Sequence, residues 1–400
     1  MSPVHMFTAA DGARLAVWRW LLPDDERPHG GVMIVHGLGE HAGRYLHVAE
    51  RLNHMGWQVW AYDHYGHGRS DGARGTLSHP DRLQTDLADL LDSLRGTLPA
   101  GAPLVLLGHS MGGLVAAHYV QRQIAREGAD AAQRPRVDAL MLSSPALAIR
   151  TNALQKLLLA SMPHLAPNLG VGNGLDANRI SHDPAVVAAY RADPLVHDRI
   201  SGRLARFIAD AGPEVVARAP GWKVPTLLMY AGSDLLVNPA GSRAFGAAAP
   251  SQVVRAQCYP DLYHEIFNEV ESQPVFDLLH DWLIANRQKV PDGSATAKAI
   301  DYSLKRWAQL THFVDDGDVP ISNNWVENQI RPIALGRSNW LFAGSLRAGR
   351  RAAAVMSLLH SARINGHDPY AYFKDVLERL PTHPASRIDE LLPHRWSAAS

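Results

Sequence analysis

The chain has 400 residues, of which 46% are hydrophobic and 20% are charged, a composition typical of soluble globular proteins. This length exceeds that of one ordinary domain, so we expect two. The 39 basic and 39 acidic side chains give a formal net charge of zero, so the net charge does not point to any class of partner. The single cysteine, Cys258, excludes an internal disulfide and a cysteine cluster for zinc or iron–sulfur binding.

The first residues have neither the basic end nor the apolar stretch of a secretory signal. No apolar run approaches the roughly 18 residues that a membrane span needs. We therefore expect a cytoplasmic protein without a transmembrane segment.

Strand and helix patterns alternate from residue 14 to about residue 290. Strands are predicted at Arg14–Trp20 as an edge strand, then at Val32–Val35, Gln58–Tyr62, Leu104–Leu107, Val137–Leu142, Val224–Tyr230 and Val253–Tyr259. Helices are predicted at 43–55, 81–97, 113–120 and 273–287. Such alternation is typical of the α/β class, with a mostly parallel sheet and helices on both faces. Active sites in these sheets lie beyond the carboxyl ends of the strands.

The sequence PLVLLGHSMGGL, from Pro103 to Leu114, has the pattern of a nucleophile elbow. An apolar strand stops at Gly108, the motif G-x-S-x-G follows, and small residues begin a helix. A sharp turn from strand to helix exposes the residue at its apex, and the flanking glycines avoid collisions there. Ser110 is therefore the predicted nucleophile. Its place at a helix N-terminus favours the negative charge of a tetrahedral intermediate.

An elbow serine needs a histidine as base and a carboxylate to orient it, in the chain order serine, carboxylate, histidine. Asp234 and His264 each follow a predicted sheet strand, in that order. His264 is expected to take the Ser110 proton, and Asp234 to hold the imidazole. Asp261 is the competing carboxylate, although its position three residues before His264 on a tight loop suits a turn-shaping role better.

The oxyanion of such a reaction needs two backbone N–H groups. Met111, directly after the nucleophile, is one predicted donor, and Leu38, in the loop after an early strand, is the other. The glycines on either side of Leu38 would let the backbone approach a substrate, although a tight strand-to-helix turn explains them equally well. His36 and His109 flank the site and are expected to form structural hydrogen bonds, because the triad already has its base.

Five motifs carry a resemblance to a known family. They are H-G-L-G-E-H-A-G-R-Y at 36–45, D-H-Y-G-H-G-R-S-D-G at 63–72, G-H-S-M-G-G at 108–113, G-S-D at 232–234 and Y-H-E at 263–265. In this order and spacing they resemble the monoacylglycerol lipase and lysophospholipase group of α/β-hydrolases, over about residues 5–287. The resemblance implies an α/β-hydrolase domain at 1–287 that cleaves a single acyl ester. It also implies Ser110, Asp234 and His264 as the triad, Leu38 and Met111 as oxyanion donors, and no metal or organic cofactor.

Residues 145–222 interrupt the alternation with prolines and short helical stretches, which predicts a helical cap over the carboxyl ends of the strands. The first predicted cap helix, Asn152–Met162, is apolar around most of its circumference. It could pack on the body of the protein. The lipase resemblance instead favours a lip of an acyl channel that touches lipid or micelle surfaces.

Residues 288–296 have the composition of a linker, and the pattern from 297 to 400 is mainly helical. Helices are predicted at Ile300–Val314, Arg351–Ile364 and Pro369–Leu380. Between Glu327 and Asp368 there is no acidic residue, yet there are six arginines: Arg331, Arg337, Arg347, Arg350, Arg351 and Arg363. Such a stretch could lie along the phosphates of a nucleic acid, although a solvated helical face is the commoner explanation.

A second resemblance covers the last hundred residues. A-I-D-Y-S-L-K-R-W at 299–307, I-S-N-N-W-V-E-N-Q-I-R-P at 321–332, A-L-G-R-S-N-W-L-F-A-G-S at 334–345 and R-I-D-E-L-L-P at 387–393 resemble the C-terminal end of an insertion-sequence transposase with a DDE-type nuclease core. In that family Glu327 would be the third metal-binding carboxylate. The first two carboxylates are missing, and one carboxylate cannot clamp two divalent ions. We therefore interpret 297–400 as a transposase remnant fused to a hydrolase. A DNA-binding or transposase-related protein acting through this segment is the alternative function.

Overall fold

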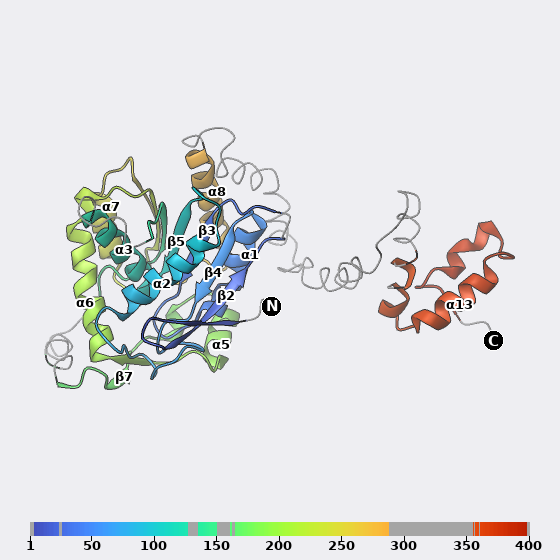
Figure 1. Ribbon diagram of the computed structural model, residues 1–400, viewed down its shortest axis with the longest axis horizontal. Coiled ribbons are helices and arrows are strands. Elements are labelled where there is room, and N and C mark those ends of the chain that lie inside the picture. The colour runs from blue at the N-terminus through green and yellow to red at the C-terminus, as the bar shows by residue number, and fades with distance from the viewer. Residues whose placement is uncertain are drawn as a thin grey trace. The chain divides into compact units, whose positions relative to one another are not determined.

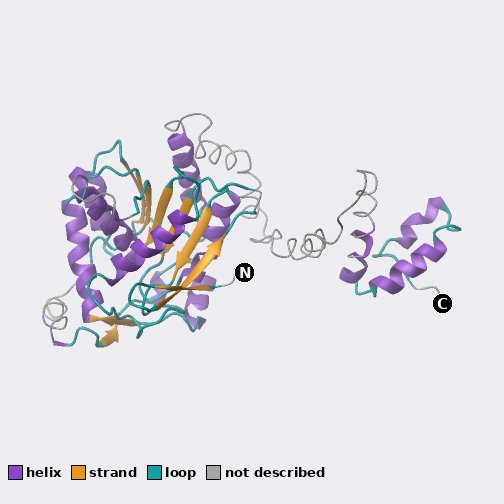
Figure 2. Cartoon of the chain, viewed as in Figure 1, coloured by secondary structure: helices purple, strands orange, loops and turns teal. Residues whose placement is uncertain are grey.

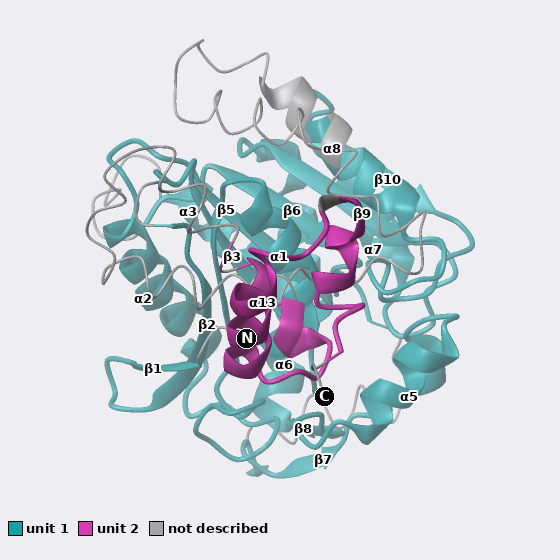
Figure 3. Ribbon diagram, turned by 90° about the vertical axis from the view of Figure 1, so that its right-hand side faces the viewer, with its two compact units in different colours: residues 1–319 teal, residues 320–400 magenta. Residues whose placement is uncertain are grey.

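The computed structural model describes residues 4–23, 26–126, 135–149, 161, 165–287, 355, 357–359 and 361–397. The chain divides into two compact units, Met1–Val319 and Pro320–Ser400, which Figure 3 colours separately. The described residues of the first unit hold a large sheet, and those of the second unit hold a small helical cluster.

The first unit is built on a sheet that has eight strands among its described residues (Figures 1 and 2). Their order is β1-β2-β4-β3-β5-β6-β9-β10. β2 pairs antiparallel with β1 and β4, and all the other neighbours are parallel. The strands are β1 His5–Thr8, β2 Arg14–Trp20, β3 Gly31–Val35, β4 Gln58–Tyr62, β5 Leu104–His109, β6 Ala139–Ser143, β9 Thr226–Ala231 and β10 Val254–Tyr259. This sheet confirms the predicted α/β class.

The central strands bury both of their faces because helices cover both sides of the sheet (Figure 1). In β3, Met33 and Val35 belong to one core, while Val32 and Ile34 belong to the other. The first core also receives side chains of α2 Arg82–Gly96, α3 Ser110–Ala125, α6 Gly202–Ala217 and α7 Pro239–Ala248, and the second receives those of α1 Leu46–His54 and α8 Gln273–Arg287. Burial on both faces explains why these strands are continuous apolar runs in the sequence.

The helix predicted at 273–287 is observed as α8 with the same bounds. Its Val275, Phe276 and Leu279 are buried in the core that contains Ile34 of β3. Each such side chain contributes roughly 1.5–3 kcal/mol of burial free energy. α8 is therefore an integral cover of the sheet.

The edge of the sheet differs from the prediction. Arg14–Trp20 is predicted as the edge strand, but β1 pairs outside it, with His5 opposite Val17. β1 has only four residues, and most of them are exposed. Such a strand has too little apolar pattern to be detected in the sequence.

The helix predicted at 43–55 is divided in two. It begins as a 3-10 turn, η1 Ala42–Tyr45, and continues as α1. The side chains of Asp63 and His41 accept hydrogen bonds from the first N–H groups of η1, at 2.8 and 3.2 Å. These contacts hold the tighter first turn against the loop that follows β4.

The region predicted as a cap contains several short elements. β7 Gly170–Gly172 and β8 Arg199–Ser201 pair antiparallel, and η2 Ala177–Arg179 and α5 Pro184–Ala192 lie between them in sequence. α6, at the end of this region, packs on α3 and α7. The predicted helix Asn152–Met162 lies outside the described residues, apart from Ser161.

The second unit has its own small core in its described part. The predicted helix Pro369–Leu380 is observed as α13 Pro369–Arg379, followed by η5 Ala385–Leu391. Tyr372 is buried and its hydroxyl donates to the carbonyl of Leu391 at 2.8 Å. Of the predicted helix Arg351–Ile364 the structure describes residues 355, 357–359 and 361–364, and all of these are helical. The predicted linker and the helix Ile300–Val314 lie outside the described residues and stay predictions.

Truncation after Arg287 is expected to leave the sheet unit folded, because the cut follows α8 and keeps both cores. The thermal midpoint of the sheet, measured by circular dichroism, should change by less than about 3 °C, or roughly 1 kcal/mol. Light scattering should show less aggregation, because exposed apolar side chains such as Tyr370 and Leu377 are removed. If the truncated protein is instead unfolded or insoluble, the tail must contribute to the fold of the sheet unit.

Candidate active site

The turn from β5 into α3 places Ser110 at its apex. β5 lies between β3 and β6, inside the sheet. Ser110 has a φ of 54°, in the left-handed region that residues other than glycine rarely adopt. Strain of this kind costs about 1–3 kcal/mol and is found most often at functional sites. The backbone therefore has the shape that the sequence predicts for a nucleophile elbow.

Backbone atoms pack so closely around this turn that two positions have no room for a side chain. A Cβ on Gly108 would lie 2.5 Å from the carbonyl oxygen of Gly112. A Cβ on Gly112 would collide with the carbonyl oxygen of Val35, at the end of β3. The start of α3 is thus pressed against the end of β3, which places Ser110 beside the loop that begins at His36.

The loops that follow β9 and β10 supply Asp234 and His264. Nδ1 of His264 lies 2.6 Å from Oδ2 of Asp234. The other carboxylate oxygen accepts the N–H groups of Leu236 and Val237 at 2.8 and 3.0 Å. A carboxylate can only accept, so Nδ1 of neutral His264 carries the proton and Nε2 is left as an acceptor. The carboxylate that contacts His264 is therefore Asp234, and not its competitor Asp261.

Burial and polar contacts act in opposite directions on the pKa values of this pair. Burial alone would raise the pKa of Asp234, but the charge and hydrogen bond of His264 and two backbone N–H groups hold it below its ordinary value. Burial alone would lower the pKa of His264, but the charge and hydrogen bond of Asp234, then the charges of Glu265 and Glu40, raise it. Asp234 is thus ionised at neutral pH, and a carboxylate in this position can stabilise an imidazolium beside it.

Ser110 and His264 line the same cavity, which has a volume of about 550 Å³. Leu38 and Met111, the predicted oxyanion donors, line it too. Most of the other lining side chains are apolar, and those from the predicted cap include Leu169, Val171, Leu175, Ile180 and Ile200. A cavity of this size and character fits a small ligand with a long apolar part.

His36 and His109 have hydrogen-bonding partners inside the protein. Nδ1 of His109 lies 3.0 Å from the hydroxyl of Ser143, and burial together with the nearby His264 lowers the pKa of His109 to about 3. Nε2 of His36 accepts the N–H of His64 at 3.0 Å, and burial lowers the pKa of His36 well below its ordinary value. Both rings are therefore neutral at physiological pH and hold the loops around the site.

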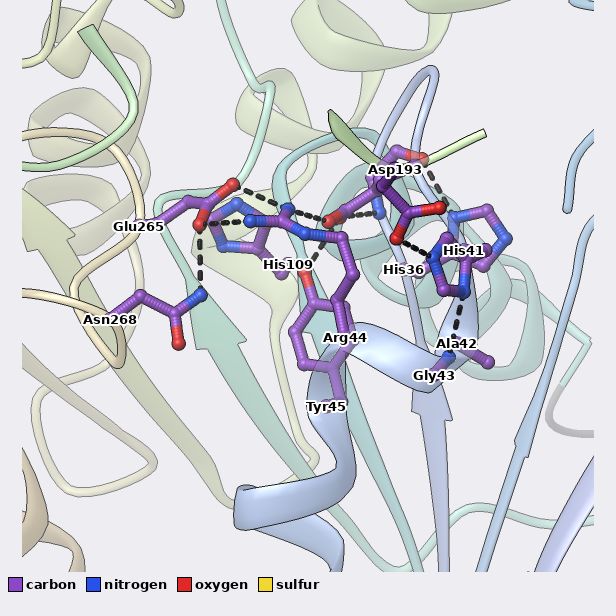
Figure 4. Close-up of polar contacts among 12 residues, drawn as sticks. His36, His41, Ala42, Gly43, Arg44, Tyr45, His109, Asp193, Glu265 and Asn268 are labelled. Atoms are coloured by element: carbon purple, nitrogen blue, oxygen red, sulfur yellow. Dashed lines mark hydrogen bonds and ion pairs between the residues drawn. The ribbon is translucent and has the colours of Figure 1, made fainter. Parts of the chain in front are cut away.

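A buried ionic cluster beside the cavity has no counterpart among the predicted site residues (Figure 4). Arg44 donates from Nη1 to Oε2 of Glu40 at 2.5 Å and to Oε1 of Glu265 at 2.6 Å, and from Nη2 to Oε2 of Glu265 at 2.8 Å. Both carboxylates line the cavity. The spacing of four between Glu40 and Arg44 is a signal that could have predicted their pair. Glu265 lies 221 positions from Arg44, and no local pattern connects them.

Part of the predicted cap is attached to the loop of the predicted base. The N–H of Glu265 donates to the carbonyl of Ile180 at 2.8 Å. Glu269 accepts the N–H groups of Tyr263 and His182 at 2.7 and 3.1 Å, and the His182 ring stacks on Tyr263 at 3.6 Å. The two segments therefore hold each other in place.

No cluster of three or more His, Cys, Asp or Glu side chains within the described ranges is arranged to hold a metal ion. No helix in the part of the chain that the structure describes is long and apolar enough to cross a membrane. Glu327 and five of the six arginines noted in the tail, namely Arg331, Arg337, Arg347, Arg350 and Arg351, lie outside the described residues, whereas Arg363 is described and exposed. Their predicted roles stay predictions.

Comparison with known proteins identifies the larger part of the chain. Residues 26–271 match the family described as serine aminopeptidase, S33. The chain belongs to this family. A monoacylglycerol lipase of Mycolicibacterium smegmatis is 38% identical over 283 residues, which cover 70% of this chain and 97% of that protein. The phospholipase YtpA of Bacillus subtilis is 32% identical over 65% of this chain and 96% of its own length.

Solved structures place the fold in the same group. The crystal structure of a monoacylglycerol lipase from Paleococcus ferrophilus aligns with a TM-score of 0.59 and 32% identity, over 68% of this chain and 98% of that one. The predicted α/β-hydrolase fold and the first resemblance are confirmed.

The second resemblance is confirmed as well. Residues 262–351 match the IS66 transposase family and residues 357–394 match the IS66 C-terminal element. The uncharacterized protein y4hP of Sinorhizobium fredii is 44% identical over 130 residues, which cover 32% of this chain and 24% of that protein. The chain is therefore a hydrolase joined to the C-terminal part of a transposase.

The contact between Asp234 and His264 generates a prediction for two matched variants. Asp234→Asn should fold but lose about four powers of ten in kcat on a p-nitrophenyl ester, because an amide no longer holds the required tautomer. Asp261→Asn should stay within roughly threefold of the wild type, as for most exposed substitutions away from a site. Circular dichroism checks the fold of both. The opposite ranking would assign the orienting role to Asp261.

Proposed function

We propose that this chain hydrolyses carboxylic esters that carry a single acyl chain, through an acyl-enzyme intermediate on Ser110. The observation that carries the proposal is the 2.6 Å contact of His264 with Asp234 at a cavity that Ser110 and His264 both line. Serine, histidine and carboxylate in these roles perform acyl transfer in several unrelated folds. The relatives named as monoacylglycerol lipase and phospholipase support ester hydrolysis.

In the acylation step, Oγ of Ser110 attacks the ester carbonyl carbon while Nε2 of His264 takes the hydroxyl proton. The carbonyl oxygen becomes an oxyanion, which accepts the N–H groups of Leu38 and Met111. Asp234 stabilises the imidazolium formed on His264. The tetrahedral intermediate then collapses, and His264 gives its proton to the departing alcohol.

Deacylation repeats these steps with water. His264 takes a proton from a water molecule, and the resulting hydroxide attacks the acyl carbon of the Ser110 ester. The same two N–H groups hold the second oxyanion. Collapse releases the carboxylic acid and returns the proton from His264 to Ser110.

The cavity supports a substrate with one acyl chain and a small polar head, such as a monoacylglycerol or a lysophospholipid. Its apolar lining suits one alkyl chain, and the predicted cap supplies much of that lining. Leu169, Val171 and Leu175 line the cavity and are also 55%, 47% and 37% exposed. Apolar side chains at such a place suit contact with a lipid or micelle surface.

The transposase-derived tail has no part in this proposal. The described residues that line the cavity end at Glu265, well before the second unit begins. DNA binding through the arginines of the tail remains the alternative function, and a gel-shift assay at moderate salt tests it directly.

Ser110→Ala is expected to abolish labelling by a fluorophosphonate probe and to lower ester hydrolysis by roughly a millionfold, as loss of a triad nucleophile does elsewhere. The variant should keep the wild-type circular dichroism spectrum, since alanine removes only a hydroxyl. Residual activity above a few per cent would rule Ser110 out as the nucleophile.

Specificity constants across a panel of esters test the substrate class. Monoacylglycerols or lysophospholipids and short model esters should be cleaved, with an optimum in chain length set by the apolar cavity, and triacylglycerols should be cleaved poorly. Rates measured above and below the critical micelle concentration separate surface binding from catalysis. A flat chain-length profile, or a preference for triacylglycerol, would contradict the proposed substrate class.

A further inference from the structure

Arg44, on η1, is almost enclosed between two carboxylates. Its side chain is 11% exposed, and those of Glu40 and Glu265 are 5% and 6% exposed. The one carboxylate oxygen that Arg44 does not contact, Oε1 of Glu40, accepts the hydroxyl of Tyr45 at 2.6 Å. Asn268 adds a second donor to Oε2 of Glu265 at 2.8 Å. Burial alone would lower the pKa of Arg44, but the two carboxylates raise it well above its ordinary value, so the side chain stays charged.

Stability alone is a weak reason for such a cluster. The cost of removing three charges from water is large, and well-packed apolar residues are often as stable as a buried ionic triad. The Arg44 guanidinium also packs on the ring of Tyr190, 4.7 Å from its centroid, and Tyr190 belongs to α5 of the predicted cap. The ionic cluster therefore joins three separate segments around the cavity, namely the loop after β3, the loop after β10 and α5.

Each carboxylate is attached to a loop that the proposed reaction uses. Oε1 of Glu40 accepts the N–H of Gly37 at 2.5 Å, which fixes the peptide just before the Leu38 N–H. A Cβ on Gly37 would lie 2.7 Å from that oxygen and 3.1 Å from Cβ of Ser110, so the loop has little freedom. Glu265 directly follows His264 in the chain.

We propose that Arg44 is a positioning residue, which sets the oxyanion loop against the loop of the catalytic histidine by joining Glu40 to Glu265. Its planar guanidinium suits this role, because it donates to both carboxylates in fixed directions, whereas a lysine ammonium is a single point charge. The inference rests on the proposed ester hydrolysis. Displacement of the Leu38 N–H from the developing oxyanion would slow the chemical step more than substrate binding.

The cluster also bears on the protonation of His264. The charged and titratable groups that face this ring are Asp234 at Nδ1, the Glu265 and Glu40 carboxylates, and the neutral ring of His109 at 4.7 Å. The charge of Glu265 contributes to the raised pKa of His264, and the reaction needs His264 unprotonated in the free enzyme. Loss of that charge should therefore move the acid limb of kcat/KM to lower pH.

The test compares Arg44→Gln with Arg82→Gln on the full chain, using p-nitrophenyl butyrate. Arg82 is the matched control, because it is 1% exposed and pairs at 2.7 Å with the buried Asp86, outside the cavity lining. Arg44→Gln should lower kcat about ten- to hundredfold, less than the 10²- to 10³-fold cost of losing a whole oxyanion donor, with KM within about threefold. Arg82→Gln should lower the thermal midpoint but keep kcat within roughly twofold.

Two conservative variants decide the matter if Arg44→Gln does not fold. Arg44→Lys keeps the positive charge but loses the planar guanidinium that donates to both carboxylates. This variant should also lower kcat at nearly unchanged KM. Glu265→Gln removes one charge with little change of shape. Its activity is compared at one pH unit below the pH at which wild-type kcat/KM is half-maximal. There the variant should retain a fraction of its own maximal kcat/KM that is at least about twice the fraction that the wild type retains.

The inference fails if the Arg44 variants lose stability as Arg82→Gln does but keep kcat within about twofold. It also fails if Glu265→Gln leaves the acid limb unchanged. Failure of the proposed function is a separate outcome: the wild type would then show no hydrolysis of the ester, or hydrolysis that survives Ser110→Ala.

Discussion

The close packing of Gly112 against the carbonyl oxygens of Val35 and His36 is the constraint on which the site depends. Because no side chain fits between α3 and the end of β3, the chain must turn sharply after β5. The turn leaves Ser110 at a positive φ, with the first N–H groups of α3 beside it. Gly37 is also close to this turn, because a Cβ on it would lie 3.1 Å from Cβ of Ser110. Backbone packing thus holds the proposed nucleophile close to the predicted oxyanion loop, and side-chain contacts complete the alignment of this loop with the proposed base.

The parallel register of the sheet brings the loop of His264, the proposed base, to the same edge as the turn at Ser110. Val35 of β3 pairs with Gly108 of β5, and Tyr259 of β10 pairs with Ala231 of β9. The carboxyl ends of the paired strands therefore lie side by side. Loops that leave a parallel sheet at the same edge can converge, although their sequences are far apart. A shift of one residue in any pair would turn the side chains of that strand to the opposite face and exchange the two cores. The strand register that packs the two cores correctly is therefore also the register that places the site residues correctly.

The sequence was sufficient for features that depend on local pattern or on strand order. Apolar runs predicted the inner strands, and the order of Ser110, Asp234 and His264 predicted the hydrogen bond that the structure contains. Features that depend on long-range contact were missed. β1 is short and exposed, and its partner strand alone defines it. The pairing of Arg44 with Glu265 joins residues 221 positions apart, and nothing near either one signals the other before the loops meet.

The junction between the two parts of the chain can be argued from packing. Residues 262–271 belong to both family matches, so sequence similarity alone does not divide the chain there. The hydrogen bond of His264 and the burial of Phe276 in the core of the sheet show that the chain is still folded as a hydrolase through this overlap and into α8. The described part of the tail instead packs Tyr372 and Val376 with each other. No described residue of the tail belongs to either sheet core, and α8 already covers one face of the sheet, so we expect the hydrolase fold to tolerate a fusion of this kind.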